Sequence, residues 1–502
     1  MDAPAAGTAG ASAAELDAYR EQAELFLQEL NREQYLHYAG LKERLELDPI
    51  YERHAELTEL ERVRTIARGV DGGRRVRELW RFACEGHLGA LTREHTERIA
   101  RLETELQATV DGTNVGFRML APTIANEPDR GRRERLERAQ RELTEEHLNP
   151  VYVEAAERTR ETVPAFGLPT YLDLYRRFGF DLDELADECR DVLDSTERLW
   201  EESADRLFRA RVGLGLDEAE RWDVPRVFRA PEWDSAFPKE GMLRALEGTL
   251  AELGVALRAQ ENIKLDVEAR PLKTPRAFCV PIEIPARIML VIQPIGGPDD
   301  WHALFHEAGH AEHFAHASAT LAFEEKRLGD NAVTEAWAML IEHLVDEPAW
   351  LTRRLDVPRP TDFAREGATL LLYFVRRYAA KLLYEVELHG GGELGAMRGR
   401  YVELLAEALK IEPSDTNFLA DVDPGFYASA YLRAWAAEAQ LRTFLREEFG
   451  NAWFTRREAG SLLRELWSEG QRMTADELLR ELTGADLALE AVAERIRETL
   501  AR

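Results

Sequence analysis

One segment interrupts an otherwise helical sequence, and it limits the folds open to this chain. Most of the 502 residues place apolar side chains at helical spacing. Six prolines fall between residues 271 and 300, where each removes a backbone donor and interrupts a helix. Two runs without internal proline lie among them, at 276–280 and 286–293, and the second, ARIMLVIQ, is apolar and β-branched. The sequence therefore predicts an all-α, mainly helical fold with one small β-hairpin.

Length and charge narrow the class of protein further. A chain of 502 residues is too long to fold around one simple hydrophobic core. We therefore expect two helical lobes, 1–190 and 191–502. The formal net charge of −28 argues against a nucleic-acid partner, because such proteins neutralise phosphates with Lys and Arg. No apolar stretch approaches the ~18 residues that a membrane span requires, so no membrane partner is expected either.

The cysteines and the first residues indicate the compartment. Cys84, Cys189 and Cys279 lie far apart and form no CxxC motif, so a disulfide framework is not expected. Residues 1–20 lack the basic and apolar regions of a signal peptide and are interpreted as a flexible tail. We therefore expect a cytoplasmic protein, and the sequence leaves its oligomeric state open.

The residues after the proline-rich segment carry the chemistry. Asp299 and Asp300 suit the N-cap of a helix that contains the motif HEAGH. His306 and His310 of the motif are four residues apart, so both imidazoles lie on one helical face and can bind one metal ion. Neutral imidazole is a good zinc ligand. Glu307 is rotated from His306 by about 100°, which lets it contact a water molecule at the metal without binding the metal.

A catalytic zinc ion needs a third protein ligand and an open coordination position. The candidate is Glu335, in an apolar helix that Asp330 or Asn331 would cap. Glu342 lies seven residues further along the same helical face, where it can accept a hydrogen bond from a ligand histidine. We therefore predict one zinc ion (Zn2+) per chain, held by the two motif histidines and Glu335, although cobalt or manganese suits the same ligands.

These segments resemble a known family. LFHEAGHAEHFAHAS (304–318) followed by VTEAWAMLIE (333–342) is similar to the zinc-site sequence of the thimet oligopeptidase and oligoendopeptidase F family of zinc metallopeptidases. The segment before the motif, the segment DPGFYASAYLRAWAAEAQL (423–441) and the closing segment 459–484 resemble further parts of that family. The similarity extends over residues 270–484 and fades toward the N-terminus.

The resemblance implies a fold, an activity and several residue roles. Members of the family are all-helical, with a deep channel between two lobes and zinc at its floor, and they cut short peptides. By motif position, the three predicted ligands keep that role, Glu307 becomes the catalytic base and residues 191–502 become the catalytic lobe. Tyr427 and Tyr431 fall where the family places tyrosines that donate hydrogen bonds to the oxyanion.

The sequence also departs from the family. The family usually has a histidine just before the tyrosine segment, but here Ala420, Asp421 and Asp423 occur, and no histidine follows His389. Two functions from different classes are therefore considered. The first is a metalloendopeptidase that hydrolyses short oligopeptides by zinc-activated water, or that cuts near the peptide C-terminus if Arg433 binds the terminal carboxylate. The second is a weakly active or inactive metal-containing protein that binds peptides.

The predicted strands suggest how a peptide would bind. An extended peptide can add to an exposed sheet edge through backbone hydrogen bonds. We expect the run ARIMLVIQ to be such an edge strand, facing a wall formed by residues 1–190. A proline at Leu290 or Val291 is then expected to raise KM, because proline removes a ladder donor. This arrangement predicts cleavage of short, unfolded peptides and none of folded proteins.

Overall fold

The computed structural model describes residues 10–502, so residues 1–9 of the expected tail lie outside the described part. The first helix begins at Ala13, earlier than the expected end of the tail at residue 20. Ser12 caps this helix and forms a capping box with Glu15, which satisfies backbone donors at the helix start. Along residues 10–502, no helix has the length and apolar character needed to cross a membrane.

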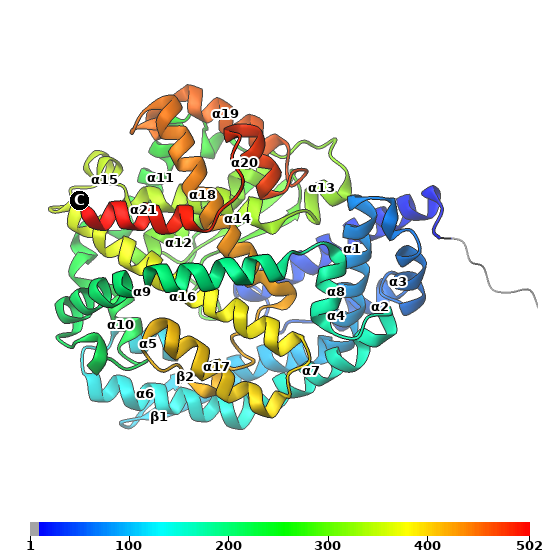
Figure 1. The fold of residues 1–502 in the computed structure, drawn as a ribbon, viewed down its shortest axis with the longest axis horizontal. Helices are drawn as coiled ribbons and strands as arrows, with labels where there is room; N and C mark the ends of the chain where they lie inside the picture. The colour runs from blue at the N-terminus through cyan, green and yellow to red at the C-terminus, as the bar shows by residue number, and fades with distance from the viewer. Residues whose placement is uncertain (1–9) are drawn as a thin grey trace, which may run out of the picture.

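Helices dominate the described chain, and the all-α prediction is confirmed (Figure 1). The helices up to Val212 are α1 (Ala13–Tyr38), α2 (Asp48–Arg53), α3 (Leu60–Ala67), α4 (Arg74–Glu105), α5 (Phe117–Asn126), α6 (Arg130–Leu143), α7 (Asn149–Thr162), α8 (Tyr171–Phe178) and α9 (Leu182–Val212). The later helices are α10 (Val224–Arg229), α11 (Met242–Glu252), α12 (Pro298–His316), α13 (Phe323–Arg327), α14 (Asn331–Glu342), α15 (Pro348–Arg354), α16 (Pro360–His389), α17 (Leu394–Leu409), α18 (Tyr427–Phe449), α19 (Arg457–Ser468), α20 (Ala475–Thr483) and α21 (Glu490–Ala501).

Two small sheets accompany the helices. β1 (Gln107–Val110) and β2 (Thr113–Gly116) form an antiparallel hairpin that the sequence analysis did not predict. The predicted hairpin consists of β4 (Phe278–Glu283) and β5 (Arg287–Val291), which pair antiparallel. β3 (Ile263–Asp266) pairs parallel with the other side of β5, so the strand order of this sheet is β3-β5-β4.

The expectation that the run ARIMLVIQ forms an edge strand is wrong. Its strand, β5, lies in the centre of the three-stranded sheet, and β3 and β4 form the edges. A proline at Leu290 or Val291 would therefore remove a donor from a strand that is paired on both sides. Such a substitution would disturb folding rather than test peptide binding.

The three-stranded sheet supports α12, the helix that carries HEAGH. Side chains of β5 alternate between the two faces of the sheet. Ile288 and Leu290 on one face belong to the main hydrophobic core, which also contains Trp301 of α12. Met289 on the opposite face packs in a smaller cluster with Ala39, which directly follows α1. The sheet thus lies between α1 and α12 and fixes the position of the motif helix.

The predicted boundary between the two lobes falls inside a helix. α9 runs without a break from Leu182 to Val212, across the expected division at residues 190 and 191. In Figure 1, α1–α3 and α8 gather at one end of the molecule, α15 and the C-terminus lie at the opposite end, and α9 and α16 run across the middle. The division into two lobes stays a prediction, and α9 would belong to both lobes.

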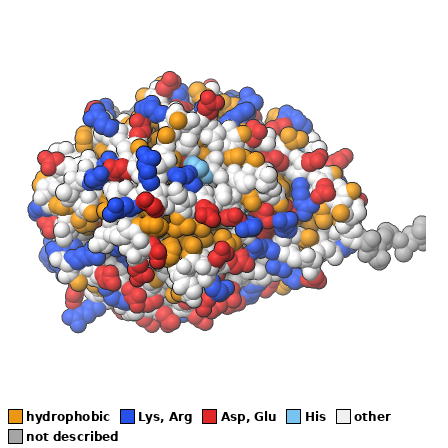
Figure 2. Space-filling model, turned by 90° about the horizontal axis from the view of Figure 1, so that it is seen from above, with side chains coloured by type: hydrophobic (Ala, Val, Ile, Leu, Met, Phe, Trp, Pro, Cys, Tyr) orange, Lys and Arg blue, Asp and Glu red, His pale blue; other side chains and the backbone are white. Residues whose placement is uncertain are grey.

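The surface carries charges of both signs. Figure 2 shows acidic and basic side chains interspersed over one face of the molecule, with apolar side chains between them. The net charge of −28 is therefore not gathered into a single acidic patch on that face.

Candidate metal centre

The candidate site is built where two helices cross. α12 carries the HEAGH motif, and α14 carries Glu335. Gly309 of the motif lies at the crossing, where a Cβ atom would come within 2.5 Å of Ala338 Cα and 2.7 Å of the Trp337 carbonyl oxygen. Only glycine permits this approach without a shift of α14. Gly309 therefore helps to bring the candidate ligands of the two helices together, a role that the sequence analysis missed.

The two helices begin differently. No side chain caps α12, which starts with Pro298 at its first position, so the predicted N-cap role of Asp299 or Asp300 is wrong. α14 is capped by Asp330, one of the two residues expected there. Its carboxylate accepts a hydrogen bond from the Ala332 backbone N–H at 3.1 Å, which satisfies a free donor at the helix start.

Arg433 supports this cap and is not free to bind a substrate carboxylate. Its guanidinium donates to both carboxylate oxygens of Asp330, at 2.9 and 2.7 Å, and it also pairs with Asp476. Bidentate pairs of this kind hold both partners in one orientation. Arg433 is considered as a ligand of a peptide C-terminus only for an enzyme that cuts near that end; the structure gives it a structural role at the start of α14.

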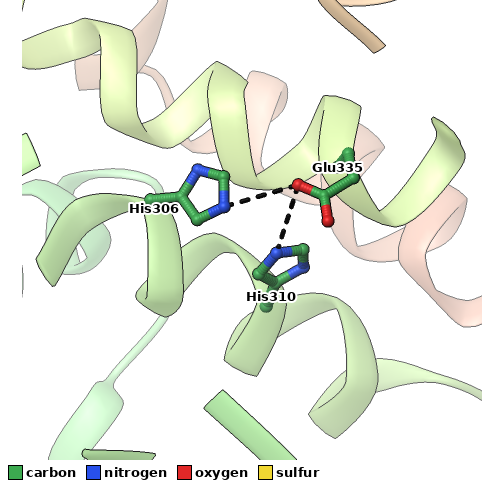
Figure 3. Close-up of side chains that lie close together, drawn as sticks. All are labelled: His306, His310 and Glu335. Atoms are coloured by element: carbon green, nitrogen blue, oxygen red, sulfur yellow. Dashed lines mark ion pairs between the residues drawn. The ribbon is translucent and has the colours of Figure 1, made fainter. Parts of the chain in front are cut away.

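Three side chains converge from the two helices (Figure 3). His306 Nε2 and His310 Nε2 lie 3.4 and 3.5 Å from the same atom, Glu335 Oε2. The candidate ligand atoms all lie within 4.8 Å of one another. Two imidazole nitrogens and one carboxylate oxygen at such separations form a donor set that suits a divalent transition-metal ion. The structure thus brings together the three residues that the sequence predicted as ligands.

Each histidine is oriented by a contact at its other ring nitrogen. His306 Nδ1 lies 2.7 Å from Glu342 Oε2, so the structure places Glu342 where the sequence analysis expected it. His310 Nδ1 lies 2.9 Å from Thr334 Oγ1, a contact that the sequence analysis missed. An acceptor at Nδ1 holds the proton on that nitrogen and leaves the Nε2 lone pair free for a metal ion.

The contacts of the Glu335 carboxylate indicate whether a cation fits between the three side chains. Its Oε1 atom accepts a hydrogen bond from the Tyr427 hydroxyl at 2.7 Å. Its Oε2 atom is buried, and no donor among the described residues bonds to it. Burial raises the pKa of Glu335, but the neighbouring His310 and His306 lower it more, and the pKa lies well below its ordinary value. A buried, ionised oxygen without a donor is costly, and a metal ion bound between the three side chains would remove that cost.

Glu307 lies beside this cluster but not in it. It follows His306 in α12, and the backbone of Cys279 in β4 lies close enough to lower the pKa of its carboxyl group. Burial raises the pKa of Glu307 above that of an ordinary carboxyl group, while the two motif histidines lower it and Glu335 raises it further. A raised pKa makes a carboxylate a better proton acceptor near neutral pH.

The two predicted tyrosines have different surroundings. The Tyr427 hydroxyl is engaged by Glu335, whereas no hydrogen bond of the Tyr431 hydroxyl occurs within residues 10–502. Their rings meet edge to face with centroids 5.3 Å apart. Burial raises the pKa of both phenols, so both stay protonated near neutral pH and can donate a hydrogen bond.

The segment just before Tyr427 is tied to α16 by ion pairs. Asp421 accepts hydrogen bonds from Arg377 at 2.6 Å, and Asp423 accepts one from Lys381 at 2.6 Å. Two basic residues of α16 therefore hold the chain just before Tyr427. No sequence pattern indicates these pairs, because the partners lie about forty residues apart along the chain and only the fold brings them together.

The fold and the cluster define a mainly helical protein with a convergent His-His-Glu site. No protein-family model matches the chain, and no curated protein matches its sequence. Solved structures match its fold over nearly its whole length. A protein with the provisional name oligoendopeptidase F has a TM-score of 0.71 and 17% identity, with 98% of this chain and 94% of that chain covered.

Two further structures agree with this likeness. A Bacillus anthracis protein with the same provisional name has a TM-score of 0.62 and 16% identity, with 98% of this chain and 86% of that chain covered. PZ peptidase A with an inhibitor has a TM-score of 0.68 and 15% identity, with 98% of this chain and 97% of that chain covered. At these identities the likeness shows a shared fold, so the all-helical fold that the sequence resemblance implied is confirmed.

Proposed function

We propose that this chain is a zinc-dependent metalloendopeptidase of the thimet oligopeptidase and oligoendopeptidase F family that hydrolyses short oligopeptides. The observation that carries the proposal is the buried Oε2 atom of Glu335, which faces the Nε2 atoms of His306 and His310. Glu307 beside them supplies a carboxylate with a raised pKa. The shared fold with PZ peptidase A supports the same class of activity.

The proposed mechanism assigns one task to each group. His306, His310 and Glu335 would hold zinc, which when bound would supply Lewis-acid chemistry that makes water more acidic. Glu307 accepts the proton of the water that attacks the peptide carbonyl and then delivers it to the leaving amine. Tyr431, whose hydroxyl makes no hydrogen bond within residues 10–502, donates a hydrogen bond to the developing oxyanion. Tyr427 keeps Glu335 in place through the 2.7 Å hydrogen bond.

The substrate is proposed to bind as an extended chain along β4. This strand lies at an edge of its sheet, and side chains of Asn31 and Arg327 already bind carbonyls in its second half. The Cys279 backbone in its first half lies close to Glu307, so a peptide paired there passes the base. Pairing through the backbone gives affinity that does not depend on side chains, and it requires an unfolded segment. Short flexible peptides meet this requirement, whereas a folded protein does not.

Cleavage of a quenched fluorescent peptide of about ten residues, a length that a concave site can bury, tests the proposed function. We expect the purified protein to cleave the peptide, to lose this activity with a metal chelator and to regain it when zinc is added. A stable folded protein in the same digest should stay intact by mass spectrometry. Cleavage that continues in chelator contradicts the metal mechanism. Peptide binding without cleavage would instead support the metal-containing binding protein.

Metal affinity should depend on the groups that orient the two histidines. We expect Thr334→Val and Glu342→Gln each to weaken zinc binding by ~10- to 100-fold, the usual effect of losing a hydrogen-bond partner of a ligand histidine. Thr334→Ser keeps the hydroxyl that lies 2.9 Å from His310 Nδ1 and serves as the matched control. Competition with a chromophoric chelator measures the affinity. Equal affinity in Thr334→Val and Thr334→Ser would show that the hydroxyl does not orient His310.

A further inference from the structure

The tyrosines of the site continue into a row of aromatic side chains on two helices. On α18, Tyr427, Tyr431 and Trp435 follow one another at intervals of four residues and share one helical face. On α16, Phe374 and Tyr378 have the same spacing. These five side chains are called the aromatic row below.

The rings of the aromatic row touch one another in order. Tyr431 lies between Tyr427 and Tyr378, with centroid distances of 5.3 and 5.1 Å. Tyr378 then contacts Trp435 at 5.3 Å, and Trp435 stacks with Phe374 at 6.4 Å. Aromatic pairs at these distances attract each other beyond the effect of burial. The row therefore forms a continuous aromatic cluster that begins at the residue bonded to Glu335, with Trp435 buried beneath the other rings.

The aromatic row is partly open to solvent. Tyr431 and Tyr378 are half-buried, and 38% of Phe374 is exposed, which makes it one of the large apolar side chains that the described part of the chain leaves uncovered. Phe374 and the two half-buried tyrosines are contiguous with the proposed site, where an apolar group of a ligand that covers them is removed from water. Because the row starts at the Tyr427 contact with Glu335, the ligand that can reach it is the peptide at the proposed active site.

The charged neighbours of the row leave its apolar character intact. Lys381 and Arg377 lie 5.1 and 5.7 Å from the ring centroid of Tyr378, where a cation is attracted by the ring. Their charges are matched by Asp423 and Asp421. The cations thus steady the Tyr378 ring without presenting an unpaired charge to an apolar ligand.

The length of the aromatic row indicates how far from the scissile bond a peptide residue must lie to contact its far end. Trp435 follows Tyr427 by eight residues, about 12 Å along a helix that rises ~1.5 Å per residue. An extended peptide spans this length with three to four residues at about 3.3 Å each. We infer that the aromatic row is a specificity subsite, which binds an aromatic or long aliphatic side chain about three to four residues from the scissile bond. The inference rests on the proposed function, because it concerns the same site.

A matched set of peptides tests the inference. The peptides differ only in carrying Phe, Leu or Ser at one position on either side of the scissile bond, and mass spectrometry gives kcat/KM for each. At one position about three to four residues from that bond, we expect Phe and Leu to exceed Ser by ~10-fold, the discrimination typical of a hydrophobic subsite. Phe374→Gln keeps a good helix former in α16 but removes the ring, and it should reduce this ratio to about 3-fold or less.

Two further variants control the comparison. Phe374→Leu keeps an apolar side chain and should retain the preference. Leu41→Ala removes another exposed apolar side chain, 50% exposed and outside the aromatic row, and should leave the ratio unchanged. The affinity of Glu307→Gln for labelled Phe and Ser peptides reports binding without cleavage.

The outcomes separate the two proposals. Cleavage without a preference for apolar residues, or with a preference that Phe374→Gln does not change, overturns the aromatic row as a subsite. If the wild type cleaves no peptide while Glu307→Gln binds the Phe peptide more tightly and loses this preference with Phe374→Gln, the subsite is supported and the peptidase proposal fails. If neither cleavage nor binding occurs, both proposals are overturned.

Discussion

Glu307→Gln is expected to lower kcat by at least ~10²-fold while the protein keeps its zinc, because the change removes general-base catalysis and leaves the ligands intact. Glutamine has the shape of glutamate but cannot accept the proton of the attacking water. The side chain lies beside the His306, His310 and Glu335 cluster without belonging to it, so the metal ligands are unchanged. Steady-state kinetics on a quenched peptide and elemental analysis of the same sample measure the two effects.

Variants of the three ligands provide the contrast. His306→Ala, His310→Ala and Glu335→Gln should each lose both zinc and activity, because each removes one of the converging donor atoms. Asp299→Asn changes an exposed carboxylate in the first turn of the same helix and serves as the matched control, with zinc and activity retained. A Glu307→Gln protein that loses zinc as severely as His306→Ala would show that Glu307 binds the metal.

The helical fold was predictable because its signal is local. Apolar spacing at the helical period and the proline-rich segment 271–300 depend only on neighbouring residues, and they predicted the helices and the β4–β5 hairpin. The strand order was not predictable in this way. β3 pairs with β5 across more than twenty residues of chain, so the central position of β5 depends on contacts that the sequence does not display.

In the candidate site, too, some contacts follow from local sequence spacing and others depend on the folded chain. The spacing of His306 and His310 fixes one helical face, and Glu342 lies on the face of α14 that carries Glu335, so these contacts follow from helical geometry. Thr334 could not be identified, because a threonine next to a candidate ligand has no distinctive pattern. The approach of α12 and α14 at Gly309 depends on how two helices cross, which only the folded chain determines.

Tyr431→Phe is expected to lower kcat by ~10²- to 10³-fold with little change in KM, the usual effect of removing one donor to an oxyanion. The expectation rests on the difference between the two tyrosines. Tyr427 donates to Glu335 at 2.7 Å, whereas the Tyr431 hydroxyl makes no hydrogen bond within residues 10–502. Tyr427→Phe should therefore weaken zinc binding, because it removes the hydrogen bond that orients a ligand.

Kinetics and zinc affinity of Tyr431→Phe, Tyr427→Phe and the double variant decide between these roles. Tyr152→Phe, in α7, removes a phenol hydroxyl away from the site and should behave as the wild type. Because phenylalanine keeps the ring, Tyr431→Phe leaves the aromatic row in place, so its effect on kcat is separate from any change in peptide preference. A larger loss of kcat in Tyr427→Phe, with unchanged zinc affinity, would show that Tyr427 rather than Tyr431 donates to the oxyanion. Wild-type activity in all three variants would show that neither tyrosine stabilises the oxyanion.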